Sequence, residues 1–210
     1  MVLEEDTILY FTTTHLLHIT ISTKTYTSFT HHYFYKKVYT PQAVCCVETD
    51  VADGESVKCM VGKTLEEFGQ IDILVNNAGV FSYTRIDAVS EEEWDRMLAV
   101  NLKGPFLCSL AVMGTMKDQR FGRIINLGSL AGQVGGIVVS APYSASKAGV
   151  MCLKKSFARV LGEYGITVNS IVPGIAATEM AKNHLDTTDD IPFGHVADPS
   201  DVANAILFLA

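Results

Sequence analysis

The chain has 210 residues, of which 48% are apolar and 19% are charged. This length and composition predict one globular domain, or at most two small ones, and exclude disordered, collagen-like and coiled-coil proteins. The formal net charge is -7, from 16 basic and 23 acidic residues, and the basic residues are scattered, which excludes a typical nucleic-acid-binding surface.

The cysteines and the first residues bear on the cellular compartment of the protein. The chain has five cysteines, an odd number, with no spacing typical of a zinc site or a disulfide framework (Cys45, Cys46, Cys59, Cys108, Cys152). The first residues are acidic, and threonine and histidine interrupt every early apolar run. We therefore expect a soluble cytoplasmic protein with no metal and no membrane partner.

Residues 1–41 differ in composition from the rest of the chain. They contain no glycine, arginine or alanine, but ten threonines and four of the six histidines (His15, His18, His31, His32). Residues 16–22 alternate apolar and polar side chains with the period of a strand, which predicts a β-prone or unstructured arm. A metal site at the four histidines is the less favoured alternative, because no carboxylate or cysteine lies among them.

From residue 42 onwards, short apolar runs alternate with amphipathic stretches, which is typical of a parallel sheet with helices. We predict strands at residues 43–48, 71–75, 123–127 and 167–171. We predict helices at residues 55–68, from Ser90 past Asn101 towards Met116, at residues 143–164 and at residues 201–209. Ser90 and Glu93 have the spacing of a capping box, and Pro105 is placed to kink or restart its helix.

A tyrosine and a lysine at the start of one predicted helix form a candidate acid/base pair. Tyr143 and Lys147 are four residues apart, so both side chains project from the same helix face. A nearby ammonium stabilises a phenolate and brings its pKa closer to neutral. The spacing alone also occurs in ordinary surface contacts, so the surrounding motifs must decide its meaning.

Further motifs follow the predicted strands in order. Asn77, Ala78 and Gly79 come after residues 71–75, Ser129 after residues 123–127, and Pro173 after residues 167–171. In an open parallel sheet, ligands lie beyond the carboxyl ends of the strands, so these residues predict one shared crevice.

This ordered set, together with Asn101, Tyr143 and Lys147, resembles the short-chain dehydrogenase/reductase family. It resembles especially the members similar to the bacterial 3-oxoacyl-acyl carrier protein reductases, and the resemblance covers residues 42–210. It implies an α/β fold, a Rossmann-like doubly wound parallel sheet with helices on both faces. It also implies an oxidoreductase that transfers a hydride between NAD(P)(H) and a ketone or secondary alcohol.

The resemblance implies a role for each catalytic candidate. Tyr143 would exchange a proton with the substrate oxygen, and Lys147 would lower its pKa and hold the nicotinamide ribose. Ser129 would orient the carbonyl, and Asn101 would bend its helix and hold a water connected to the lysine.

Cofactor-binding residues follow from the same resemblance. Asp50 and Val51 would meet the adenine, and Asn77, Ala78 and Gly79 would lie beside the adenosine ribose. The segment with Pro173, Gly174, Ala176 and Thr178 would close over the nicotinamide. Asp50 could instead begin a turn before Gly54, and the Asn77 turn could simply end a strand. His195 stands where the family usually has arginine, and we interpret it as structural. Neither NAD nor NADP is favoured.

The resemblance also implies a homo-oligomer, a dimer or tetramer. The interface would lie on residues 101–116 and 143–164, which carry apolar side chains beyond one face (Phe106, Leu107, Leu110, Met113, Val150, Met151, Leu153, Phe157).

The chain departs from the family before residue 42 and at its end. No glycine precedes Gly54, so the turn that would approach the pyrophosphate is missing, together with two strands. Residues 43–48 would then have no neighbour in the sheet, and one further strand is expected after Ala210. We therefore expect an atypical arm at 1–41 and a partial domain at 42–210, from a truncated or altered gene product. The arm would lie loosely on the surface or pair with the sheet through residues 16–22. The alternative function is a non-catalytic fragment or pseudoenzyme that cannot hold the cofactor.

Overall fold

The structure is a computed structural model that describes residues 6–11, 18–23, 44–136, 139–178 and 191–210. The strands are β1 (Asp6–Phe11), β2 (His18–Thr23), β3 (Val44–Cys46), β4 (Ile73–Asn76), β5 (Gly122–Leu127) and β6 (Ile166–Ile171). The helices are α2 (Gly54–Phe68), α3 (Glu91–Leu98), the π-helical turn η1 (Ala99–Lys103), α4 (Gly104–Gln119), α5 (Ala131–Val134), α6 (Ala141–Leu161), the 3-10 turn η2 (Gly162–Tyr164) and α7 (Pro199–Leu209).

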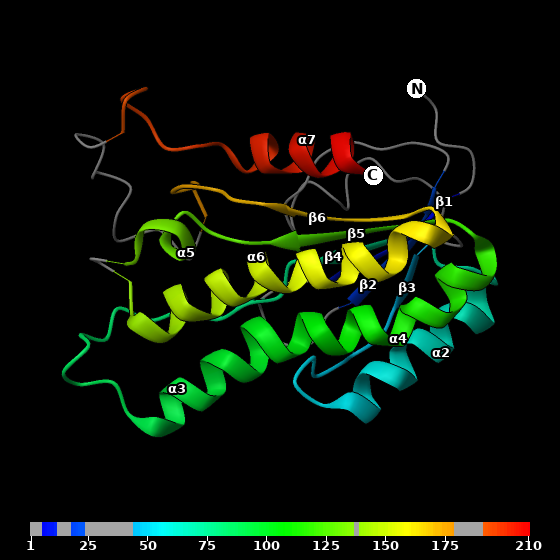
Figure 1. The fold of residues 1–210 in the computed structure, drawn as a ribbon, viewed down its shortest axis with the longest axis horizontal. Coiled ribbons are helices and arrows are strands. Elements are labelled where there is room, and N and C mark those ends of the chain that lie inside the picture. Colours follow the sequence, from blue (N-terminus) through cyan, green and yellow to red (C-terminus); the bar gives the residue numbers. More distant parts are fainter. Residues whose placement is uncertain (1–5, 12–17, 24–43, 137–138, 179–190) are drawn as a thin grey trace.

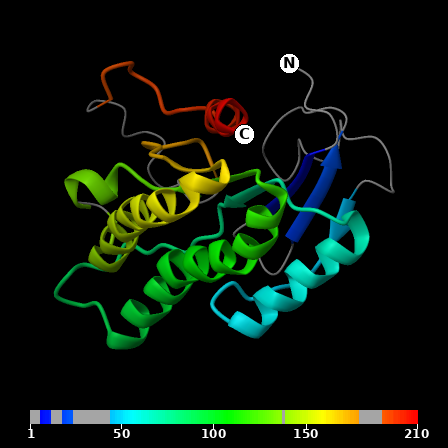
Figure 2. The same ribbon diagram turned by 45° about the vertical axis from the view of Figure 1, so that its right-hand side comes forward.

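The strands form one sheet with the order β3-β2-β1-β4-β5-β6. Strands β1, β4, β5 and β6 are parallel to one another, whereas β2 is antiparallel to both of its neighbours. Figure 2 shows β1 and β2, in blue, side by side at one end of the sheet. This order is that of doubly wound Rossmann-like folds, so the predicted α/β class is confirmed.

The prediction that residues 43–48 have no neighbour is wrong. Strand β3 pairs with β2, and both β1 and β2 come from the arm. The prediction that residues 16–22 pair with the sheet is confirmed for residues 18–22, while residues 16 and 17 lie outside the described residues. Only six residues join β1 to β2, fewer than a parallel crossover needs, so β2 runs antiparallel. The alternative metal site also involves His15, His31 and His32, which lie outside the described residues.

Helices cover the two faces of the sheet unequally. Figure 1 shows α2, α4 and α6 along one face and α7 on the other. The larger core cluster lies between the sheet and the helices α2, α4 and α6. It includes Met60, Leu74, Val112 and Ile124. A smaller cluster joins the central strands to α7 through Ala203 and Ile206. The predicted helices and central strands are confirmed, with ends that differ by a few residues.

The helix that begins at Glu91 continues to Gln119 through the π-helical turn η1. Proline has no N–H for the normal helical hydrogen bond, and η1 widens the turn just before Pro105. At its start, the Ser90 hydroxyl accepts from the Glu93 N–H at 3.2 Å, but the Glu93 carboxylate accepts from Ser82. Only half of the predicted capping box is therefore present.

This same run is the one helix among the described residues that is long and apolar enough to cross a membrane, by length and composition alone. Its α4 part packs against β4 and β5. Val112 and Met116 lie in the larger core cluster, as expected for the core helix of a globular domain.

Candidate active site

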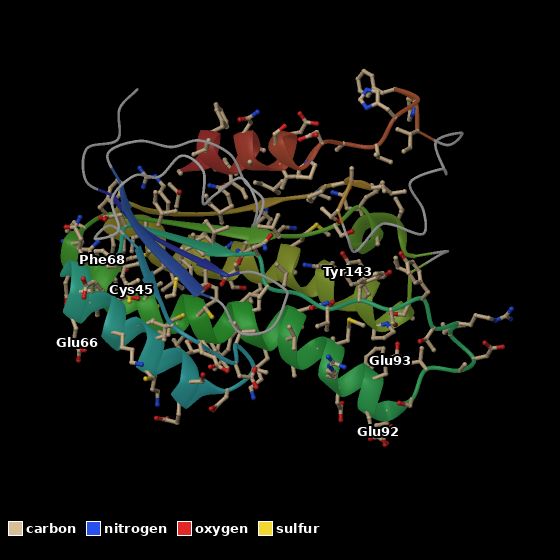
Figure 3. All side chains as sticks on the ribbon, turned by 180° about the vertical axis from the view of Figure 1, so that it is seen from behind. Cys45, Glu66, Phe68, Glu92, Glu93 and Tyr143 are labelled. Carbon is tan, nitrogen blue, oxygen red and sulfur yellow. The ribbon has the colours of Figure 1, made fainter. Side chains whose placement is uncertain are left out.

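The carboxyl ends of the central strands and the start of α6 bring the predicted site residues to one end of the sheet. Asn77 follows β4, Ser129 follows β5, and Pro173 follows β6. Tyr143 and Lys147 lie in the first two turns of α6. Figure 3 shows Tyr143 at the same end of the molecule as Glu93, with Cys45, Glu66 and Phe68 at the opposite end.

Lys147 is a buried ammonium group. Its side chain is only 6% exposed, and Nζ donates to the backbone oxygen of Leu127 at 2.7 Å. Removal from water disfavours the charged form and lowers the pKa of Lys147 to about 8. The Nζ atom lies 5.8 Å from the centre of the Tyr143 ring, so the predicted pair is brought together.

The Ser129 side chain lies close enough to the Tyr143 hydroxyl to affect its pKa. Burial raises the pKa of Tyr143 above its ordinary value, and the nearby Ser129 opposes this to a smaller extent. The expectation that Lys147 brings this pKa down is therefore not met, because desolvation of the phenol is the larger effect. The tyrosine is a protonated phenol at neutral pH.

Asn101 occupies the π-helical turn and is buried. Its side chain accepts from the Val80 N–H and donates to the Val80 oxygen, both at 2.7 Å. It also donates to the Ser146 hydroxyl at 3.2 Å, and Ser146 donates to the Tyr143 backbone oxygen at 2.7 Å. A chain of hydrogen bonds thus connects Asn101 to the helix turn that carries the tyrosine.

Gly79 places Asn101 next to Lys147. A Cβ atom at Gly79 would lie 3.3 Å from Asn101 Oδ1 and 3.5 Å from Lys147 Nζ, so both atoms approach the same point. The structure therefore brings together all four catalytic candidates, Ser129 and Tyr143 on one side and Asn101 and Lys147 on the other.

Sequence reasoning missed three contributors to this arrangement. Ser146 lies between the two motif residues, three positions after Tyr143, and this helical spacing could have identified it. The Leu127 oxygen and the backbone of Val80 are equally important acceptors and donors, but a backbone group leaves no signal in the sequence.

The segment after β6 lies against the segment after β5. The Leu130 N–H donates to the Pro173 oxygen at 2.9 Å. Ala176 forms a parallel bridge with Ala197, whereas Gly174 and Thr178 are exposed. His195 is also exposed, and its Nδ1 lies 2.9 Å from the Val196 oxygen. A role for this segment over the nicotinamide stays a prediction.

Asp50 and Val51 lie just before α2, and Val51 contacts the start of α4. Asp50 Oδ1 accepts from the Ala52 N–H at 2.8 Å, so this residue begins a turn before the helix, as the alternative interpretation holds. Val51 is buried, and a Cβ at Gly104 would lie 2.9 Å from its side chain. Contact with an adenine stays a prediction.

The residues near Lys147 fit the nicotinamide ribose of the cofactor better than the chain fits its pyrophosphate. The Lys147 ammonium has three N–H donors and only one acceptor among the described residues, so it can still donate to ribose hydroxyls. The family's pyrophosphate turn follows the first strand, whereas in this chain six residues without a glycine join β1 to β2. This connection is too short for the helix whose N-terminus would hold phosphates.

Comparison with known proteins identifies the family. The family model described as short chain dehydrogenase matches residues 29–189. A (2S)-[(R)-hydroxy(phenyl)methyl]succinyl-CoA dehydrogenase subunit, BbsD, from Thauera aromatica is 42% identical over 166 residues, which are 77% of this chain and 66% of that protein. The 3-oxoacyl-[acyl-carrier-protein] reductase FabG of Staphylococcus aureus is 40% identical over 169 residues, 78% of this chain and 68% of that protein.

A 3-oxoacyl-[acyl-carrier-protein] reductase from Synechocystis is also 40% identical, over 166 residues, 78% of this chain and 67% of that protein. The chain spans about two thirds of the length of these relatives. The family match covers most of the chain, including every catalytic candidate. The chain therefore belongs to the short-chain dehydrogenase family.

Proposed function

We propose that this chain is an NAD- or NADP-dependent oxidoreductase that interconverts a ketone and a secondary alcohol. The observation that carries the proposal is the buried ammonium of Lys147, which lies 5.8 Å from the Tyr143 ring, with Ser129 beside the Tyr143 hydroxyl. The names of the relatives describe reduction of a 3-oxoacyl group or dehydrogenation of a hydroxyl compound. We infer a small molecule of this kind as the substrate, in a soluble cytoplasmic homo-oligomer.

In this proposal the nicotinamide supplies the hydride, and the protein handles the proton. In the reducing direction, the Tyr143 hydroxyl donates its proton to the substrate oxygen, and the Ser129 hydroxyl donates a hydrogen bond to the same atom. Burial raises the pKa of Tyr143, which keeps this donor protonated at neutral pH. A Lys147 pKa of about 8 leaves the ammonium mostly charged at pH 7, so it favours the phenolate that remains.

A non-catalytic protein of the same fold is the second candidate. The six-residue connection between β1 and β2 favours it, because this connection supplies no glycine turn for the pyrophosphate. An assay of ketone reduction distinguishes the enzyme from the non-catalytic protein. With millimolar NADH or NADPH and a ketone, the enzyme gives turnover and the non-catalytic protein gives none.

The substitution Tyr143→Phe tests the role of the tyrosine. It removes the proton donor and keeps the ring, so we expect turnover to fall by about 10²–10⁴-fold. Tyr164→Phe is the matched control, because that ring lies under Lys117 and Arg120, near the turn that ends α4, and its loss should leave turnover unchanged. A Tyr143→Phe variant that keeps more than about a tenth of the activity excludes Tyr143 as the proton donor.

A further inference from the structure

Residues 80–83 form a segment that is fastened on both sides of the candidate active site. Both backbone groups of Val80 are bonded to the Asn101 side chain at 2.7 Å. Two residues later, the Ser82 oxygen accepts from the N–H of Ser140, the residue before α6, at 2.9 Å. The segment is therefore held in a fixed position between Asn101 and the helix that carries Tyr143.

The side chains of this segment divide between two sides. The Ser82 hydroxyl donates to the Glu93 carboxylate on α3. Phe81 turns instead towards α6, where its ring lies 6.4 Å from the Tyr143 ring at an interplanar angle of 74°. Tyr83 lies with Phe81, at 4.9 Å between ring centres and 90° between planes. Phe81, Tyr83 and Tyr143 thus form a row of edge-to-face aromatic rings.

We propose that Phe81 and Tyr83 determine substrate specificity by seating a planar aromatic group attached to the reacting carbonyl carbon. The inference rests on the proposed function, because it assumes that the substrate oxygen meets the Tyr143 hydroxyl. Both rings are only partly buried, so each leaves surface for a ligand. A ligand ring next to Phe81 would extend the existing row of rings in a favourable geometry.

The charged side chains near Phe81 and Tyr83 favour an uncharged ligand group beside these rings. The Glu93 carboxylate accepts a hydrogen bond from Ser82, the residue between Phe81 and Tyr83, and would repel a substrate carboxylate bound at this segment. Arg85, the nearest arginine along the chain, is paired with Asp87 at 3.3 Å. An apolar ring therefore fits beside this segment better than an acidic group.

Two methyl ketones of similar size test the proposal by kinetics. Acetophenone and cyclohexyl methyl ketone differ mainly in the aromatic character of the ring. We expect the wild type to prefer acetophenone in kcat/KM, and Phe81→Leu to lower this preference about three- to tenfold, mainly through KM. Phe121→Leu is the control, because Phe121 lies beneath Arg123 at the turn between α4 and β5. An unchanged preference in Phe81→Leu overturns the proposal.

Ligand binding without turnover separates this proposal from the proposed function. Saturation-transfer NMR measures binding of the same two ketones to the wild type, to Phe81→Leu and to Tyr83→Leu, which serves if the first variant does not fold. We expect the wild type to bind acetophenone more strongly than cyclohexyl methyl ketone, and the variants to lose this difference. If no ketone is turned over but this pattern appears, the catalytic proposal fails, whereas the binding of a planar aromatic group by Phe81 and Tyr83 is supported. Equal binding of both ketones to the wild type rejects the binding of an aromatic group by these rings.

Discussion

The Lys147 ammonium is buried, and the Leu127 oxygen is its one described acceptor. An ordinary lysine has a pKa of about 10.4, whereas burial lowers that of Lys147 to about 8. Between these two values the unfolded chain binds more protons than the folded protein, so the stability of the wild type rises with pH. Below pH 8 the full cost of burying the charge is present.

The substitution Lys147→Met should therefore stabilise the fold at pH 7 while it lowers activity. The stability difference from the wild type should be largest below pH 8 and should shrink as the pH approaches 10, because the wild-type lysine is then neutral. Urea unfolding at pH 7, 8.5 and 10 measures this. Lys155→Met is the matched control, because Lys155 is exposed on the same helix. A difference that stays constant over this pH range contradicts a buried charged lysine.

At the scale of single residues, the sequence predicted which side chains form the site better than it predicted the backbone groups that bind them. The spacing of Tyr143 and Lys147 placed both on one face of a helix, and the structure has them there. The position of Phe81 could not be predicted, because it depends on hydrogen bonds from Asn101 to the backbone of the preceding residue. The predicted shift in the pKa of Tyr143 had the wrong direction, because the burial of the phenol depends on the tertiary structure.

At the scale of elements, the short helix α5 presses directly on α6. A Cβ at Gly132 would lie 2.7 Å from the Ala148 nitrogen and 2.8 Å from the carbonyl carbon of Lys147. These are backbone atoms in the middle of a helix, so they cannot move aside cheaply. The absence of a side chain at Gly132 allows this contact and fixes the segment that carries Ser129.

Gly132→Ala should push α5 away from α6 and move Ser129 relative to Tyr143. We expect a loss of about 1–3 kcal/mol in the free energy of unfolding, together with reduced turnover. Gly114→Ala is the control in α4, where nothing lies within 4 Å of the added Cβ. That control should gain up to about 1 kcal/mol, because alanine favours a helix over glycine. Urea unfolding and turnover assays of both variants measure this, and equal behaviour would refute close packing at Gly132.

Hydrophobic patterns located most of the elements after residue 42, but they did not identify α5, a four-residue helix with no buried residue. Strand β1 was not predicted, since residues 1–41 have no turn signals that would mark its ends. The capping box failed at Glu93 because Ser82, which is remote in sequence, binds its carboxylate. The failure of the capping box comes from a contact that a local pattern does not contain.

At the scale of the whole molecule, α4 and α6 carry large apolar side chains that remain exposed. Phe106 is 41% exposed, Leu110 is 44% exposed and Val160 is 55% exposed. The Phe106 ring lies 6.1 Å from that of Phe157, so the two helices share this patch. Val150, which we expected at an interface, is instead buried within the protomer. We predict that the patch joins two copies of the chain.

Phe106→Arg should convert an even-numbered oligomer into a monomer, because the charge would be buried at the centre of the contact. Analytical ultracentrifugation at high micromolar concentration measures the change. Ile86→Arg is the control, since Ile86 is 80% exposed and lies outside both helices. A wild type that is already monomeric at this concentration contradicts the predicted interface.

The part of the sheet formed by β1 and β2 has a consequence for cofactor binding. Strands β1 and β2 restore the family's strand order, so the sheet that supports Ser129 and Tyr143 is complete around β4. The six residues between them contain no glycine, so we do not expect them to supply the family's phosphate-binding turn. We therefore expect the sheet to be supported at this position while the pyrophosphate loses its main anchor.

We therefore predict that the chain binds NADH and NADPH at least a hundredfold more weakly than a relative that has the glycine turn. This factor corresponds to about 2.7 kcal/mol of binding free energy. Isothermal titration calorimetry of both proteins measures it, and replacing residues 1–41 of this chain with the corresponding segment of such a relative should recover the affinity. Low-micromolar affinity of the unaltered chain for either nucleotide would mean that the arm itself provides a phosphate anchor, and the prediction would then be wrong.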